Sequence, residues 1–170
     1  MNFKKIALST FAVVAVATVA TFALPRHVTI ERSAMVEAAP DAVIALAASN
    51  SGYQSFNPYG DLDPNLKVEL FGPSSGVGSG FSFESKDGAG QQTVAAVDTG
   101  QVTFALDLGP LGQPTQAISA VAVDGATEVT WTMDMDLGMN PVFRVMGLFM
   151  DGMIGSNFEL GLAKIAEVTA

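Results

Sequence analysis

The segment that most constrains the fold is the C-terminal one, residues 140–170, NPVFRVMGLFMDGMIGSNFELGLAKIAEVTA. It is the only long run after the N-terminus in which large apolar residues recur at the three- and four-residue spacing of a helix. Asn140 and Pro141 are typical of a helix start. The rest of the domain reads as short strands with one apolar face each, and such a face needs a partner to cover it. The sequence therefore predicts one long C-terminal helix that a sheet wraps around.

Four glycines, at positions 147, 152, 155 and 161, indicate that this helix does not pack uniformly along its length. We expect residues 141–150 to form a looser lid and residues 151–168 to be the part gripped by the sheet.

Seven stretches predict strands because they are rich in β-branched and aromatic residues or alternate between apolar and polar positions. The clearest is TEVTWTMDMD, in which Val129, Trp131, Met133 and Met135 alternate with threonines and aspartates. Short turns between successive strands predict an antiparallel meander with one apolar face. The seven stretches are residues 27–38, 66–72, 78–85, 91–98, 101–108, 115–123 and 127–136.

Between the first and second strands, PDAVIALAAS predicts a short helix that begins at Pro40 and is stopped by residues 50–52. SGYQSFNPYGDLDPN, which follows, predicts a loop with one more helical turn. The fold class predicted is α+β: a seven-stranded antiparallel sheet, two short helices after the first strand and a long C-terminal helix.

This order resembles the helix-grip arrangement of the START-like (SRPBCC) superfamily, and four motifs are similar to its polyketide cyclase/dehydrase branch. The motifs are ERSAMVEAAPDAVIALAAS, FNPYGDLDPNLKVELFGPSSGVGSGFSFES, ATEVTWTMDMD and MDGMIGSNFELGLAKI. The branch usually has a tryptophan after the GVG turn, where this chain has Phe81 and Phe83. The resemblance implies a cavity between the long helix and the concave sheet that holds a lipid, a polyketide or another apolar molecule. It does not imply catalysis, because the superfamily includes binders, transfer proteins, adaptors and enzymes.

The N-terminal segment carries an uncharged run of 19 residues, IALSTFAVVAVATVATFAL, after Lys4 and Lys5. As a helix the run would be about 28 Å long, which matches a bilayer core. Its length favours an uncleaved signal anchor, and its Ala and Thr content favours a cleaved signal peptide. We therefore divide the chain into residues 1–25, a transmembrane signal anchor or signal peptide, and residues 26–170, the START-like domain. The domain is expected outside the cytoplasm, anchored to the membrane or, after cleavage, secreted.

Charge and composition exclude several functions. All 17 acidic residues but only six of the eight basic residues follow Pro25, which leaves the domain about 11 net negative charges, so nucleic acid and anionic lipid headgroups are poor partners. The chain has no cysteine and a single histidine, His27. The glycines of SSGVGSG are followed by a strand and lack a nearby lysine, so they predict a hairpin turn and not a phosphate loop.

Other groups with possible chemistry are better explained as ordinary surface residues. The Asp61/Asp63 and Asp134/Asp136 pairs lack a third oxygen ligand at suitable spacing, so we predict solvated charges and no metal site. Acid–base catalysis would need Glu159, Arg144 or Tyr53 to reach the cavity. We favour the outer face of the helix for the first two. No catalytic residue and no cofactor is predicted.

Methionine and phenylalanine side chains suit a cavity of irregular shape, although ordinary core filling explains them equally well. The first functional hypothesis is non-catalytic binding, or transfer, of a hydrophobic small molecule or lipid at the outer face of the membrane. The alternatives are a polyketide cyclase/dehydratase-like enzyme that uses a carboxylate in the cavity, and an envelope adaptor protein; the oligomeric state stays open. The residues predicted to line the pocket are Phe81, Phe83, Phe104, Trp131, Met133, Met135, Met146, Phe149, Met150 and Phe158.

Overall fold

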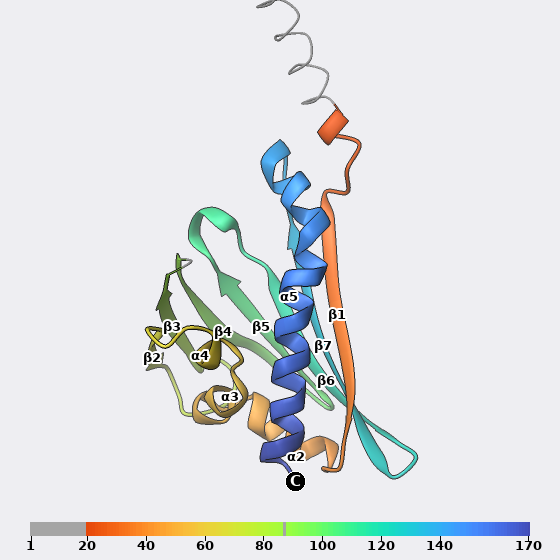
Figure 1. The fold of residues 1–170 in the computed structure, drawn as a ribbon. Coiled ribbons are helices and arrows are strands. Elements are labelled where there is room, and N and C mark those ends of the chain that lie inside the picture. Colours follow the sequence, from red (N-terminus) through yellow and green to blue (C-terminus); the bar gives the residue numbers. More distant parts are fainter. Residues whose placement is uncertain (1–19, 87) are drawn as a thin grey trace, which may run out of the picture.

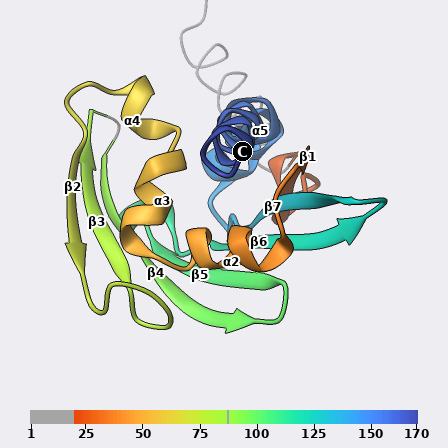
Figure 2. The ribbon, with the colours of Figure 1, turned by 90° about the horizontal axis from the view of Figure 1, so that it is seen from below.

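A seven-stranded antiparallel sheet curves around one long helix in the computed structural model, which describes residues 20–86 and 88–170. The strand order is β1-β7-β6-β5-β4-β3-β2, so the first strand of the chain pairs with the last one. Figure 2 shows the sheet bent around α2, α3 and α5, which fill its concave side. The α+β helix-grip prediction is confirmed. The strands are β1 (His27–Val36), β2 (Lys67–Phe71), β3 (Gly80–Ser85), β4 (Gly88–Asp98), β5 (Gln101–Asp107), β6 (Thr115–Val123) and β7 (Ala126–Asp136).

The helices are α2 (Pro40–Ala47), α3 (Asn50–Phe56), α4 (Tyr59–Leu62) and α5 (Pro141–Val168), with a 3-10 turn, η1, at Gly109–Leu111. The segment predicted to be mainly loop thus contains α3 and the single turn α4. The physical reason is at Ser49, whose hydroxyl accepts a hydrogen bond from the Gly52 backbone N–H at 3.0 Å and so caps a new helix. The Ser-Asn-Ser-Gly sequence that suggested only a stop also starts the next helix.

Strand β7 has the alternation predicted for it. Val129, Trp131, Met133 and Met135 are buried, at most 6% exposed, while the aspartates between and after them are exposed. β7 lies between β1 and β6, and its inward side chains therefore form the floor of the core beneath α5.

Helix α5 is continuous and is placed on the sheet through its glycines. Asn140 caps it by accepting a hydrogen bond from the Val142 N–H at 2.9 Å. A Cβ atom at Gly161 would lie 2.4 Å from Cζ3 of Trp131, and one at Gly155 would lie 2.2 Å from the Arg32 guanidinium. Apart from Arg144, the buried residues of α5 are Gly155, Phe158, Gly161, Leu162 and Ile165. They all belong to the part of the helix that was expected to be gripped.

An ion-pair cluster also ties α5 to the sheet edge. Arg32 on β1 pairs with Asp151 at 3.0 Å and with Glu159 at 2.8 Å, one on each side of Gly155. The Asp151 carboxylate has a lowered pKa because Arg32 donates hydrogen bonds to it.

Within residues 20–86 and 88–170, no helix combines the length and the apolar composition needed to cross a membrane. The predicted anchor or signal peptide covers residues 1–25, with its uncharged run at 6–24, and most of it lies outside the described residues. Figure 1 shows the first described residues and the start of α5 at the same end of the molecule, with the C-terminus at the opposite end.

Candidate ligand-binding site

An aromatic cluster fills the space between α3, α5 and the concave face of the sheet. The Tyr53 ring is central, with ring centroids 4.8 Å from Phe56, 5.2 Å from Phe81, 5.5 Å from Phe104 and 6.1 Å from Trp131. Trp131 in turn stacks on Phe158 of α5, with centroids 4.7 Å apart and planes at 6°. We call these six residues the aromatic cluster. They join helix α3, helix α5 and three strands into one apolar unit.

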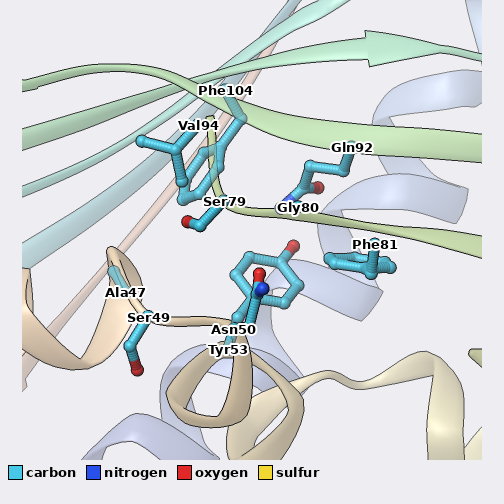
Figure 3. Close-up of a pocket in the computed structure, with 10 residues that line it drawn as sticks. All are labelled: Ala47, Ser49, Asn50, Tyr53, Ser79, Gly80, Phe81, Gln92, Val94 and Phe104. Carbon is cyan, nitrogen blue, oxygen red and sulfur yellow. The ribbon is translucent and has the colours of Figure 1, made fainter. Parts of the chain in front are cut away.

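A small cavity of about 10 Å³ lies beside the cluster, between the α2–α3 junction and strands β3, β4 and β5. That volume is close to the minimum for one water molecule. This cavity is therefore almost closed by its lining side chains, and a larger ligand needs some of them to move. The cavity is lined by Ala47, Ser49, Asn50, Tyr53, Ser79, Gly80, Phe81, Gln92, Val94 and Phe104 (Figure 3).

Tyr53 and Gln92 form the polar pair of this cavity. Figure 3 shows the Tyr53 hydroxyl directed from α3 toward β4, where Gln92 is its hydrogen-bond partner. Burial raises the pKa of Tyr53 well above its ordinary value, so the phenol stays protonated at neutral pH. The pair can exchange hydrogen bonds with a ligand, but Tyr53 is not a base there.

Two other polar residues of the lining hold the walls together. The Asn50 side-chain amide donates to the carbonyl oxygens of Phe71 at 3.0 Å and Pro73 at 3.2 Å, which fastens α3 to the end of β2. The Ser79 hydroxyl donates to the Ala48 carbonyl oxygen at 3.2 Å. Both residues are buried, so these bonds close the cavity on its α3 side.

The structure brings only some of the predicted pocket residues to this place. Phe81 and Phe104 line the cavity, and Trp131 and Phe158 belong to the aromatic cluster. The remaining buried or half-buried members pack elsewhere in the core: Phe83, Met133, Met135 and Met150. Met146 and Phe149, in contrast, are 44% and 64% exposed on the outer side of α5. They lie there because the buried side of the helix is set by Gly155, Phe158 and Leu162.

Gln92 and Asn50 lie in the cavity although the sequence did not single them out. Gln92 could have been found from alternation alone, since it is two positions before the inward-facing Val94 on the same strand. No sequence pattern indicates Asn50, because its side chain can be assigned to the interior only if α3 is known to be a helix.

Glu159 and Arg144 do not reach the cavity. Glu159 has a side chain that is 62% exposed and is paired with Arg32. Arg144 is buried, but it points to the opposite end of the domain and donates to carbonyl oxygens of Gly138 at 3.1 Å, Phe22 at 3.0 Å and Leu24 at 3.2 Å. Of the three acid–base candidates, only Tyr53 is at the cavity.

The acidic pairs have partners within the protein. Asp134 accepts a hydrogen bond from the Thr29 hydroxyl at 2.5 Å, and Asp136 is paired with Arg26, which lowers the pKa of its carboxyl. Asp63 accepts from the backbone N–H groups of Asn65 and Lys86. In the part of the chain that the structure describes, no group of three potential metal ligands comes together.

Comparison with known proteins places the chain in a family. The family model described as polyketide cyclase/dehydrase and lipid transport matches residues 27–170. No protein of curated function matches significantly.

Three solved structures illustrate the likeness in fold. The crystal structure of Ara h 8.0201 has a TM-score of 0.56 and 13% identity, with 82% of this chain and 97% of that chain covered. The Aha1 dimer from Colwellia psychrerythraea has a TM-score of 0.56 and 15% identity, over 84% and 96% of the two chains. The di-domain ARO/CYC StfQ of the steffimycin biosynthetic pathway has a TM-score of 0.61 and 10% identity, over 84% of this chain and 50% of that one. Fold and family model agree: this chain belongs to the polyketide cyclase/dehydrase and lipid transport family.

Proposed function

We propose that the domain binds a hydrophobic small molecule or a lipid non-covalently in the cavity between the α2–α3 junction and the sheet, without catalysing a reaction. The observation that carries the proposal is the Tyr53–Gln92 pair, buried beside a cavity that is also lined by the apolar side chains of Ala47, Phe81, Val94 and Phe104. Such a site offers an apolar ligand a large contact area and one hydrogen-bonding point that fixes its orientation. The family membership supports the same class of ligand.

Ligand entry requires the interior to open, because the cavity of about 10 Å³ is too small for an organic molecule. We place the opening at the α2–α3 junction, which Asn50 fastens to the end of β2 by two hydrogen bonds. Separating that junction from β3 would enlarge the existing cavity without displacing α5. Each buried ligand methylene contributes on the order of 0.8 kcal/mol, so a chain of several methylenes offsets the opening of a few hydrogen bonds.

We further propose that the domain works at the outer face of a membrane, to which residues 6–24 attach it. The support is compositional: the run is uncharged over 19 residues and follows two lysines. A ligand could then pass from the bilayer into the binding site, or back again, because the site would be held close to the lipid.

The test measures lipid bound to the purified full chain after incubation with a membrane lipid extract, by mass spectrometry. Ala47→Val fills the cavity and should lower the bound lipid, whereas Phe104→Leu enlarges it and should raise the bound lipid. Leu70→Val, at a 52% exposed position on β2, is the control and should change nothing. Because residues 6–24 can carry lipid by themselves, the difference between variants is the readout. Equal lipid content in all four proteins would refute binding in this cavity.

The placement of Tyr53 gives an enzymatic alternative, a cyclase or dehydratase acting on a polyketide-like chain. The carboxylate that this alternative was expected to use is absent from the cavity lining, so Tyr53 would have to act as a neutral hydrogen-bond donor. Conversion of an aromatic polyketide precursor by the wild-type protein, abolished in Tyr53→Phe, would favour the enzyme. Binding without conversion would favour the carrier.

A further inference from the structure

The outer side of α5 carries an apolar stripe that no part of the described chain covers. Successive members are three and four positions apart, which places them on one side of the helix. Their exposed fractions range from 44% to 70%, high for large apolar side chains that form a contiguous row. The apolar stripe consists of Val142, Met146, Phe149 and Met153 on α5, together with Met139 just before the helix.

The stripe has no charge beside it over its first half. From Leu137 to Met150 the only ionisable residue is Arg144, and its guanidinium is turned inward to backbone carbonyls. The next one along α5 is Asp151, which is paired with Arg32. This part of the helix therefore has no exposed charged side chain that would have to stay hydrated.

The apolar N-terminal run ends at the same place. Arg144 binds the carbonyl oxygens of Phe22 and Leu24, and its guanidinium carbon lies 5.3 Å from the centroid of the Phe22 ring. Phe22 is itself 42% exposed. The last residues of the uncharged run are thus fastened to the first turn of α5, at the end of the molecule where this helix begins (Figure 1).

Two occupants would suit an exposed apolar row: a bilayer or a helix of a second copy. A specific dimer needs roughly 20–30 residues from each partner, and the stripe with Phe22 supplies six. Two copies would also bring together two domains that each carry about 11 excess negative charges. A bilayer needs neither a large patch nor charge complementarity, provided that its lipids are not anionic.

We infer that the start of the apolar stripe and Phe22 insert into the interfacial layer of a zwitterionic bilayer. The inference rests on the proposed attachment of residues 6–24, which would bring this end of the domain to the lipid. α5 then enters the interface by its first turns, with Val142 deepest and Met153 shallowest. The two positions are about 16 Å apart along the helix at 1.5 Å per residue, so insertion predicts a gradient of depth.

The absence of cysteine from the chain allows a direct test. Single cysteines are introduced as Val142→Cys, Met146→Cys, Phe149→Cys and Met153→Cys, and each is labelled with an environment-sensitive fluorophore. Val121→Cys on β6 and Leu160→Cys further along α5, at positions 56% and 48% exposed, are the controls. The full chain is mixed with phosphatidylcholine vesicles, with and without a nitroxide-labelled lipid, and flotation of the vesicles reports attachment separately.

The expected result at position 142 is severalfold brighter emission with vesicles that lack the nitroxide and strong quenching with vesicles that contain it. Both effects should decline through 146 and 149 to 153, and neither should appear at 121 or 160. Protein that floats with the vesicles while all six labels behave alike would overturn docking and leave attachment intact. Protein that does not float would overturn both. Brighter emission from all four stripe labels that rises with protein concentration, without nitroxide quenching, would assign the stripe to contact with a second copy. That result would also overturn the inference.

Discussion

Replacing Gly161 by alanine should destabilise the domain relative to the same replacement at Gly152. Both glycines lie inside α5, so the gain in helix propensity, about 1 kcal/mol, is common to the two variants. They differ in surroundings: a Cβ at Gly152 meets nothing within 4 Å, whereas one at Gly161 would lie 2.4 Å from Cζ3 of Trp131.

The size of the difference follows from the packing around Trp131. Ordinary contact begins at 3.4 Å, so the ring or the helix must move by about 1 Å. The indole has little room to do so, because it is fully buried and stacked on Phe158. Overpacking of this kind costs roughly 1–3 kcal/mol. Gly152→Ala should therefore be more stable than the wild type by up to about 1 kcal/mol, and Gly161→Ala less stable than Gly152→Ala by about 1–3 kcal/mol.

The assay is urea unfolding of the full chain in one fixed detergent, followed by the fluorescence of Trp131, the sole tryptophan. Its removal from the aromatic cluster should report unfolding directly. If Gly161→Ala proves as stable as Gly152→Ala, the close packing of α5 on Trp131 is not what positions the helix.

Three further outcomes are expected. Asn50→Ala removes two buried hydrogen bonds and should lower the free energy of unfolding by about 2–3 kcal/mol, measured by urea unfolding, whereas the exposed Asn65→Ala should leave it nearly unchanged. Tyr53→Phe leaves Gln92 without its hydroxyl partner and should cost about 1–2 kcal/mol; adding Gln92→Leu should recover part of that loss, and no recovery would mean that the two side chains do not interact. Asp136 has a lowered pKa in the folded protein because Arg26 binds its carboxylate. Its contribution to stability is therefore present above the unfolded pKa of about 4 and is lost as the pH falls toward the folded pKa. Asp136→Asn should show a smaller drop in melting temperature between pH 7 and pH 3 than the wild type.

Much of the fold was predictable because the sheet is regular. Alternation along β7 fixes which side chains face inward, and the run after Asn140 has the spacing of a helix. The second short helix after β1 was predicted only as one turn within a loop, because Asn50 and Gly52 are read as breakers unless the capping role of Ser49 is known.

The candidate site was predictable only in part. Phe81 and Phe104 face the cavity, as the alternation of their strands indicates. Met146 and Phe149 have the chemical character of pocket-lining residues, but spacing alone does not say which side of a helix meets the sheet. The rotation of α5 about its axis is set by the packing of Gly161 on Trp131 and of Gly155 on Arg32. These are contacts between residues far apart in sequence.

The pairing of β1 with β7 has a consequence for how the chain reaches its native state. Thr29 and Asp134, which are joined across this pair, are 105 positions apart, so the first strand made is among the last to find its neighbour. Until then the inward residues of β1, such as Ile30, have no sheet to cover them. Contacts between such distant segments slow folding and prolong the lifetime of aggregation-prone intermediates with exposed apolar surface. A chain that folds while it is being synthesised or translocated would thus complete its sheet only near the end, when β7 and then α5 become available.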